Sequence, residues 1–298
     1  MPQDRSPMHT SSTRWALGIP HTICRALGET ALLAQTAHYH WTTLAQLVGC
    51  PASRLVDAAG REVYASVYLA EIVAPPARGL ASFGPDDELA VEGTLGRFGP
   101  SLLDGAHTLR PVGADGPTLA VRLSFVLVGR GAGADDLQVS TPSNARIDQV
   151  PPLGREPQAY RQVKALRSTG FEPPPPTARR LWPEAYSATY PINPDRDLNG
   201  VGLLYFANYV AFLDAAERAA LVSLAGLAPA QLDGRVTVRR RIAYYGNARP
   251  SDALQVGVEA FGLDAEGRRL LVQQRVCRVS DGRLIALASA ERLLIAAS

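Results

Sequence analysis

The residues best suited to chemistry in this sequence lie in one short polar loop between Asp197 and Gly202. The side-chain amide of Asn199 has no useful proton affinity, so it cannot act as a general base, but its NH₂ group can donate to a developing oxyanion. Gly200 and Gly202 allow backbone N–H groups near a helix start to approach the same oxygen. The loop therefore favours chemistry that forms an enolate or oxyanion over chemistry that activates water. Because Asn and Gly are also common turn residues, a purely structural turn is the alternative.

A second group of candidates lies on the stretch "REVYASVYLAEIV", which alternates like a strand. Tyr64 and Tyr68 share one strand face, and the apolar residues between them are expected to face a helix. A phenol has a pKa of about 10, so a nucleophilic tyrosine needs help from a nearby cation or donor. Arg61, His38 and His40 are the candidates for that help. Tyrosine is also simply a good strand residue, which leaves a structural role open.

Other polar residues give weaker signals. His38 and His40 stand two residues apart with no acidic or cysteine partner nearby, so we expect no metal site. They lie where the first loop is expected to meet its helix, so one is a candidate acid or hydrogen-bond donor, with packing at the helix entry as the alternative. Arg239 and Arg241 point to one side of a predicted strand and Arg240 to the other. The first two could bind phosphate groups or form a solvated face.

Composition excludes several classes of protein. The 298 residues are 46% apolar and 19% charged, with a net charge of +2, which fits a compact globular chain and argues against a nucleic-acid binder. Three widely separated cysteines argue against a disulfide framework or a zinc site and favour a reducing cytoplasm. Residues 1–15 have no apolar core of a signal peptide and are expected to be disordered. No run of ~20 apolar residues predicts a membrane span.

Two stretches of the chain resemble each other. "PDDELAVEGTLG" starts at Pro85 and "PSDALQVGVEAFG" at Pro250, an offset of 165 residues, and the same offset carries Asn208 onto Thr43, near the start of a predicted first helix, "WTTLAQLVG". Between the two halves lies a Pro- and Gly-rich stretch that includes Pro173–Pro176. We therefore expect a first domain at 16–145, a linker at 146–185 and a second domain at 186–298.

Each half is predicted to hold one helix followed by several antiparallel strands, which is an α+β arrangement with a sheet wrapped around a helix. The second helix is expected from Asn208 to Gly226, with Asp214 and Arg218 on its outer face. Its expected buried stripe is rich in alanine, which allows a curved sheet to approach closely. The stripe comprises Leu213, Ala216, Ala220 and Leu224.

The stretch "DLNGVGLLYFANYVAFLDAAE" resembles the loop-and-helix signature of hotdog-fold acyl-CoA thioesterases of the 4-hydroxybenzoyl-CoA type. In that family a carboxylate before the glycine-containing stretch acts as base or nucleophile. Counting back from Asn208, that position falls on Asn199, and Asp197 matches a second acidic residue of the signature. The amide in place of the carboxylate puts hydrolysis in doubt.

The layout of the whole chain resembles a double hotdog, in particular the bifunctional acyltransferase/decarboxylases of leinamycin-type polyketide biosynthesis. Those enzymes convert methylmalonyl-CoA into a propionyl group on an acyl carrier protein. Their nucleophile is a tyrosine in the N-terminal domain just after the first helix, and Tyr64 and Tyr68 are the residues here that match it.

The resemblance implies a decarboxylating acyltransferase that takes a coenzyme A thioester and delivers the acyl group to the phosphopantetheine of an acyl carrier protein, with no metal and no bound cofactor. The arginines Arg239 and Arg241 would then hold coenzyme A or phosphopantetheine phosphates. A thioesterase or dehydratase of the same fold is one alternative, and a catalytically silent module that binds acyl carrier proteins is another. Because hotdog domains pair, two in one chain allow a monomer, with a homodimer as the other possibility.

Overall fold

The first half of the chain consists of one long helix and a set of antiparallel strands. The computed structural model describes residues 8–113, 116–131, 137–170, 180–182, 185–264 and 266–294. The elements of the first half are β1 (His9–Ala16), β2 (Thr22–Ile23), β3 (Ala26–Leu27), α1 (Glu29–Val48), β4 (Val63–Val73), β5 (Glu88–Phe98), β6 (Leu102–Pro111), β7 (Leu119–Arg130) and β8 (Leu137–Val139). Helix α1 buries Leu33, Ala37 and Leu44 on one stripe, and it ends where Gly49 adopts the left-handed conformation at φ 71°.

The second half repeats this plan after a connecting helix. Its elements are α2 (Gln158–Thr169), β9 (Arg180–Trp182), β10 (Tyr186–Pro191), α3 (Pro194–Asp197), α4 (Tyr209–Ser223), α5 (Pro229–Asp233), β11 (Arg235–Tyr244), β12 (Ala253–Leu263), β13 (Arg269–Arg278) and β14 (Leu284–Leu294). Leu213, Ala216 and Ala220 of α4 are fully buried, as the sequence predicts, and Leu224 follows the helix as its partly buried cap residue.

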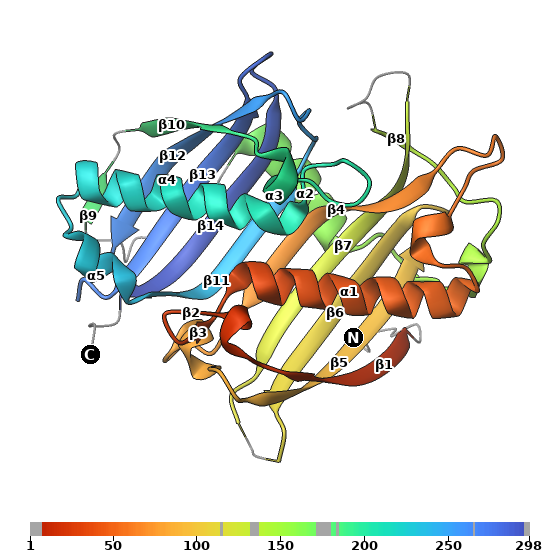
Figure 1. Cartoon of the computed structure of the whole chain (residues 1–298), viewed down its shortest axis with the longest axis horizontal. Coiled ribbons are helices and arrows are strands. Elements are labelled where there is room, and N and C mark those ends of the chain that lie inside the picture. Colours follow the sequence, from red (N-terminus) through yellow and green to blue (C-terminus); the bar gives the residue numbers. More distant parts are fainter. Residues whose placement is uncertain are drawn as a thin grey trace.

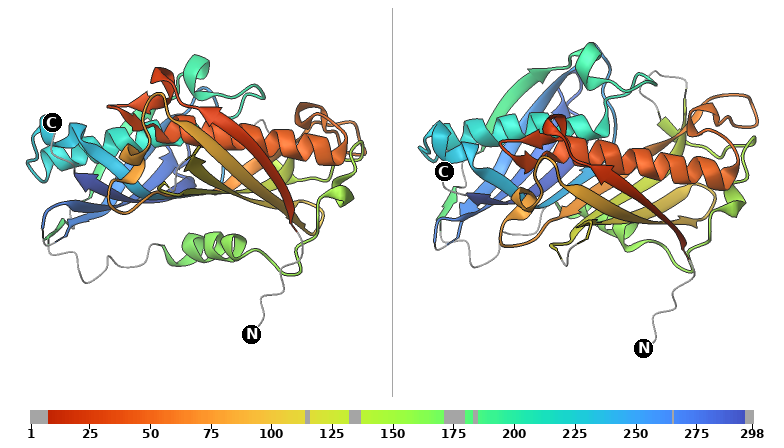
Figure 2. Two further views of the ribbon diagram at one scale, coloured as in Figure 1. Left: turned by 90° about the horizontal axis from the view of Figure 1, so that it is seen from below. Right: turned by 60° about the horizontal axis from the view of Figure 1, so that its bottom comes forward.

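The described strands form one 12-stranded sheet in the order β1-β5-β6-β7-β4-β11-β14-β13-β12-β10, with β8 beside β7 and β9 beside β12. The halves join where β4 runs antiparallel to β11, from Val73 opposite Arg239 to Leu69 opposite Ala243. Helices α1 and α4 lie side by side on one face of this sheet (Figure 1), and α2 lies on the other (Figure 2). We call these the helix face and the back face. The fold is a double hotdog of the α+β class, and this prediction is confirmed.

The internal repeat is visible in the strand order. Counted outward from the junction, β11-β14-β13-β12-β10 in the second half matches β4-β7-β6-β5-β1 in the first. Strands β5 and β12 begin at Glu88 and Ala253, the same 165-residue offset as in the sequence. The helix landmark was wrong, because Thr43 lies well inside α1 rather than near its start.

One further expectation differs from the structure. Residues 9–15, expected to be disordered, form most of β1, which pairs with β5 and buries Trp15 in the core. The segment expected as a linker contains α2, whose Val163 packs on the back face. The prolines at 173–176 and the side chain of Trp182 lie outside the described residues. No helix within the described ranges is long and apolar enough to span a membrane.

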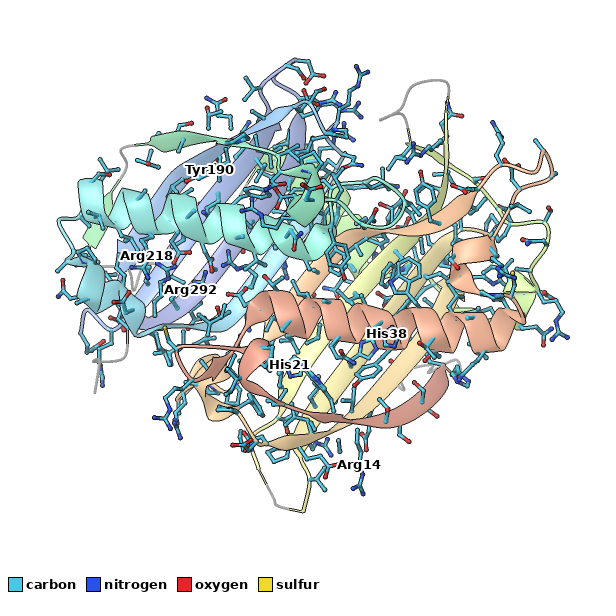
Figure 3. The ribbon with its side chains drawn as sticks, viewed as in Figure 1. Arg14, His21, His38, Tyr190, Arg218 and Arg292 are labelled. Atoms are coloured by element: carbon cyan, nitrogen blue, oxygen red, sulfur yellow. The ribbon has the colours of Figure 1, made fainter. Side chains whose placement is uncertain are left out.

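Buried charges tie the two halves together beneath the helices. Glu29, at the first turn of α1, accepts hydrogen bonds from Arg240 and Arg292 of the second half, the first at 2.9 Å. Arg292 lies between α4 and the sheet (Figure 3) and also pairs with Asp214 and Glu217. Asp214 was expected on the outer face of α4, so its pairing with buried arginines corrects that prediction. We call this set of buried charges the junction network, and it also includes Arg235, Thr237 and Gln274.

The network balances three arginines against three carboxylates. Arg240 and Arg292 are 1% and 2% exposed, so neither can be solvated if its partners are lost. Burial would raise the pKa of Glu29, but Arg240 and Arg292 outweigh it and hold that pKa below its ordinary value. A buried charge that loses its partner is costly. The network therefore specifies how the halves dock.

We expect Glu29→Gln to lower the free energy of unfolding by roughly 3–5 kcal/mol, because it leaves buried guanidinium groups underpaired. Urea denaturation of the purified chain measures this. The control is Arg14→Gln, which breaks only the exposed pair with Glu88 and should cost at most about 1 kcal/mol. Equal effects of the two changes would contradict a structural role for the network.

Candidate functional site

The polar loop of the sequence lies between α3 and α4 and begins with a structural carboxylate. Asp197 is 1% exposed and accepts a hydrogen bond from the Asn193 N–H at 2.8 Å. The Arg196 guanidinium donates to both of its oxygens, at 2.7 and 2.9 Å. Burial would raise the pKa of Asp197, but the Arg196 bonds outweigh it and lower that pKa. Asp197 closes the turn and is not free to act as a base or to contact a substrate.

Asn199 organises the rest of this loop. Its Oδ1 accepts the N–H groups of Val201 and Leu203, at 3.1 and 3.0 Å. Its own N–H donates to the Leu203 carbonyl, and its carbonyl accepts the N–H of Gly202, whose φ of 70° suits glycine. Since Oδ1 faces these donors, the Asn199 NH₂ group points away from the turn. The structural and chemical interpretations of Asn199 are thus compatible.

The Asn199 NH₂ and the Gly200 N–H have no hydrogen-bond partner among the described residues. The expected contribution of the Gly202 N–H is not available, because that group is bonded within the turn. A site for an oxyanion here therefore consists of one side-chain donor and one backbone donor.

The tip of the loop packs against the first half of the chain. Leu203 is buried with Tyr64 of β4 and Val128 of β7 on the back face of the sheet. The Arg130 guanidinium donates to the carbonyl of Val201 from the end of β7. The contact forms because β11 pairs only with residues 69–73 of β4, which leaves the start of β4 uncovered by the second half's strands. We call this contact between loop 198–205 and the start of β4 the seam.

Tyr64 is the predicted phenol that reaches the seam. Its ring is 7% exposed, and its hydroxyl is buried without a hydrogen-bond partner in the described structure. Arg130 lies two residues beyond Val128, the cross-strand partner of Tyr64, and therefore projects from the same face. The Tyr68 hydroxyl is likewise buried without a partner in the described structure, so both candidate phenols share this feature.

Tyr68 lies on the same face but away from the loop. A register shift after Val67 places both Tyr68 and Leu69 on the back face, whereas alternation predicted Leu69 on the helix face. Helix α2 covers Tyr68, with the ring of Tyr160 edge-on at 5.6 Å. Burial, followed by the nearby Asp104 carboxylate, raises the pKa of Tyr68, so it is a poorer nucleophile than an ordinary tyrosine.

The two histidines do not flank a loop. Both lie well inside α1, which starts at Glu29, so their predicted place at the helix entry was wrong. His38 is exposed, and His40 stacks on Phe125 at 4.0 Å on the helix face, with the sheet between it and the tyrosines. Of the predicted helpers, Arg61 is paired with Asp57. None of the three is placed to activate Tyr64.

The predicted phosphate-binding arginines lie on the back face near the far end of β4. Arg241 pairs with Glu71 at 2.5 Å, while Arg239 is exposed opposite Val73. Because Tyr64 is at the opposite end of the same strand, these arginines do not join the seam. Sequence reasoning missed Arg130, which only the register between β4 and β7 brings beside Tyr64. No trio of metal-ligating side chains gathers in the described part of the chain.

A shallow cavity of about 280 Å³ lies beside α4 and β10, and neither Asn199 nor Tyr64 lines it. Tyr190, at the edge of the sheet, forms one wall (Figure 3) and Phe212 of α4 another. The Arg196 guanidinium, held by Asp197, lies 6.0 Å from the centre of the Phe212 ring. The remaining lining is apolar, so the cavity holds none of the unpaired donors of the loop.

Comparison with solved structures identifies similar folds at low sequence identity. A protein from Lactobacillus plantarum described as an oleoyl thioesterase aligns with a TM-score of 0.65 and 11% identity over 97% of this chain and 96% of that one. The 12:0-ACP thioesterase of Umbellularia californica aligns at 0.60 and 12%, over 95% and 93%. An acyl-ACP thioesterase of Bacteroides thetaiotaomicron aligns at 0.56 and 10%, over 95% and 97%. These likenesses establish the fold across both halves. No family model and no curated protein matches the sequence.

His40 and His107 give a prediction about stability. Burial lowers the pKa of His107 to about 4 and, together with His107, lowers that of His40 well below its ordinary value. In the unfolded chain histidine has a pKa of about 6.5, so these two histidines bind protons more tightly there than in the folded protein. The contribution of these histidines to the free energy of unfolding is therefore greatest above about pH 6.5 and decreases as the pH falls toward 4. The loss is about 1.4 kcal/mol for each unit by which the pKa differs between the folded and unfolded states.

Urea denaturation between pH 8 and pH 4.5 tests this expectation. His107→Gln should flatten the decline, because the glutamine does not titrate. The control His38→Gln changes an exposed histidine and should keep the wild-type profile. An unchanged profile in the His107 variant would show that the buried histidines are not its cause.

Proposed function

We propose that this chain is an enzyme that acts on acyl thioesters at the seam. The observation that carries the proposal is that Leu203, from the loop that Asn199 organises, is buried in one cluster with Tyr64 and Val128. An amide donor from the second half and a buried phenol from the first half thus belong to one site. Thioester chemistry needs both kinds of group, one for the carbonyl oxygen and one to receive the acyl group.

The first step of the proposed reaction is decarboxylation of a methylmalonyl-type thioester. The carbon–carbon bond to the carboxylate breaks, CO₂ leaves, and the electron pair forms an enolate on the thioester. The Asn199 NH₂ and the Gly200 N–H stabilise the enolate oxygen, and a proton then adds at carbon to give a propionyl thioester. The apolar side chains of Val201 and Leu203 at the seam solvate the departing carboxylate poorly, which favours its loss.

The second step transfers the propionyl group to a carrier protein. The Tyr64 oxygen attacks the thioester carbonyl and releases coenzyme A, and the phosphopantetheine thiol of the carrier then attacks the tyrosyl ester and restores the phenol. Tyr68 is the weaker candidate because its pKa is raised by burial. Arg239 and Arg241 stay outside this scheme, because they lie at the far end of β4 from Tyr64 and Arg241 is paired with Glu71.

Hydrolysis is the second candidate, and the fold favours it, since the three similar solved structures carry thioesterase names. The loop argues against it, because Asp197 is tied to Arg196 and the next polar position holds an amide. Neither of these two positions therefore offers water a free carboxylate as a base. Neither scheme requires a metal or a bound cofactor. The pairing of β4 with β11 supplies a hotdog pair within one chain, so the scheme works for a monomer in the cytoplasm.

Incubation with methylmalonyl-CoA and a phosphopantetheinylated carrier protein tests the first candidate. Mass spectrometry of the carrier should show a propionyl adduct with the wild type. We expect Tyr64→Phe to lose the adduct and Asn199→Ala to slow its formation by about 10²–10³-fold, the usual effect of removing one oxyanion donor. Because the Tyr64 hydroxyl is buried and unpaired, the Tyr64→Phe variant should be at least as stable as the wild type. Tyr68→Phe is the matched control, and we expect it to keep carrier transfer. Free propionate without carrier adduct, across several carriers, would refute transfer.

Asn199→Asp separates the two candidate reactions. The aspartate keeps an oxygen for the Val201 and Leu203 N–H groups but replaces the NH₂ donor with a carboxylate that can activate water. We expect carrier transfer to fall and release of free acid from propionyl-CoA to rise, as followed by a thiol assay with chromatography of the acid. If the wild type hydrolyses propionyl-CoA faster than the variant does, the amide is compatible with hydrolysis and the argument against a thioesterase is wrong.

A further inference from the structure

Helix α2 is an amphipathic helix whose outer face carries only positive charge. Its inner residues, Ala159 and Val163, are buried against the back face of the sheet. Its exposed residues include Arg161, Lys164 and Arg167, and its sequence, QAYRQVKALRST, contains no acidic residue. The three cations follow one another at intervals of three residues, so they form one stripe on the solvent side. We call them the cationic stripe.

Nothing in the described structure neutralises this stripe. None of its three side chains forms an ion pair with the described acids, unlike most arginines of the second half. Lys164 lies 4.1 Å from the centre of the Tyr160 ring, and the Arg167 guanidinium lies 5.7 Å from that of Tyr245. These cation–π contacts hold the charged groups of Lys164 and Arg167 over ring faces, while both residues stay exposed at the surface. Helix α2 is the outermost layer on its side of the molecule (Figure 2).

The stripe lies on the same side of the sheet as the seam. Helix α2 covers Tyr68, and Tyr64 lies four residues back along the same strand, about 13 Å away at the usual rise of a strand. A partner that docks on α2 is thus beside the proposed reacting phenol. Because the apolar face of α2 is already buried on the sheet, the helix has no apolar surface with which to enter a membrane.

We propose that the cationic stripe is the docking surface for an acidic acyl carrier protein, which presents its phosphopantetheine arm to the seam. This inference rests on the proposed function and adds the partner's binding site. Opposite charges on two protein surfaces raise the association rate and orient the encounter, and the effect weakens with salt. The chain as a whole is near neutral, at +2, so the stripe is a local feature rather than part of a general positive field.

Lys164 is the single lysine of the sequence, which allows a direct test. A zero-length carbodiimide reagent joins carboxylates to amines, so a docked acidic carrier should become linked to this chain at Lys164. The linked peptides are identified by mass spectrometry. Lys164→Arg keeps the positive charge but removes the amine, so we expect it to lose the link while retaining carrier transfer. A link that persists at equal yield in this variant, or that maps to the amino terminus, would overturn the proposal.

Charge reversal tests the energetics. We expect the triple change R161E/K164E/R167E to lower kcat/KM for the carrier by at least about tenfold, since rim charges act mainly on association. Transfer to a small free thiol and KM for the coenzyme A thioester should stay unchanged. The matched control R54E/R78E/R268E alters three exposed arginines on other elements by the same total charge and should have little effect. Equal losses in both variants, or a rise only in KM for the coenzyme thioester, would overturn carrier docking.

The two proposals can fail separately. Linking at Lys164 without any thioester chemistry would refute the proposed function and keep the docking surface. Carrier transfer that persists in the R161E/K164E/R167E variant, together with no link at Lys164 in the wild type, would refute the docking surface and keep the function. Binding of α2 to anionic vesicles or to RNA at physiological salt, with no carrier link, would assign the stripe to another partner and overturn the proposal.

Discussion

The structure depends on a set of charges that cannot be satisfied within either half alone. Glu29 begins the helix of the first half, and its partners Arg240 and Arg292 belong to the second. All three are buried, so sliding one half against the other would leave charges without partners in a medium that solvates them poorly. Apolar packing of two helices tolerates small shifts, but a hydrogen-bonded ion network does not. The network thus determines the register in which one hotdog unit meets the other.

That register creates the seam. Because β11 covers only the later part of β4, the start of β4 meets a loop from the other half instead of a strand. Asn199 folds this loop through its own side-chain oxygen, and the same geometry leaves the amide nitrogen and the Gly200 N–H unbonded within the described residues. Structural and chemical demands on one residue coincide here, since the turn that positions the donors also places Leu203 in one buried cluster with Tyr64 and Val128.

The sequence predicted what depends on local pattern. Alternation identified the strand of Tyr64, and a repeated turn-and-strand motif identified the doubled fold. The sequence did not predict features that depend on contacts between elements far apart in the chain. The first helix was expected over "WTTLAQLVG", with His38 and His40 at its entry, whereas α1 starts at Glu29. Residues 1–15 were expected to be disordered, whereas β1 is ordered by pairing with the distant strand β5. The bulge at Tyr68 and the position of Arg130 follow from strand register, which no local pattern gives. Likewise, Asp214 looked like a surface charge until its arginine partners from β11 and β14 were in place.

The central claim is that an amide from one half and a phenol from the other act on a single thioester. A crystal structure of the protein with a non-decarboxylating methylmalonyl thioester analogue tests it most directly. The account predicts the analogue's carbonyl oxygen within hydrogen-bonding distance of the Asn199 side-chain nitrogen, with the carbonyl carbon next to the Tyr64 hydroxyl. An analogue bound in the cavity beside Tyr190 and Phe212, with Asn199 and Tyr64 untouched, would contradict it.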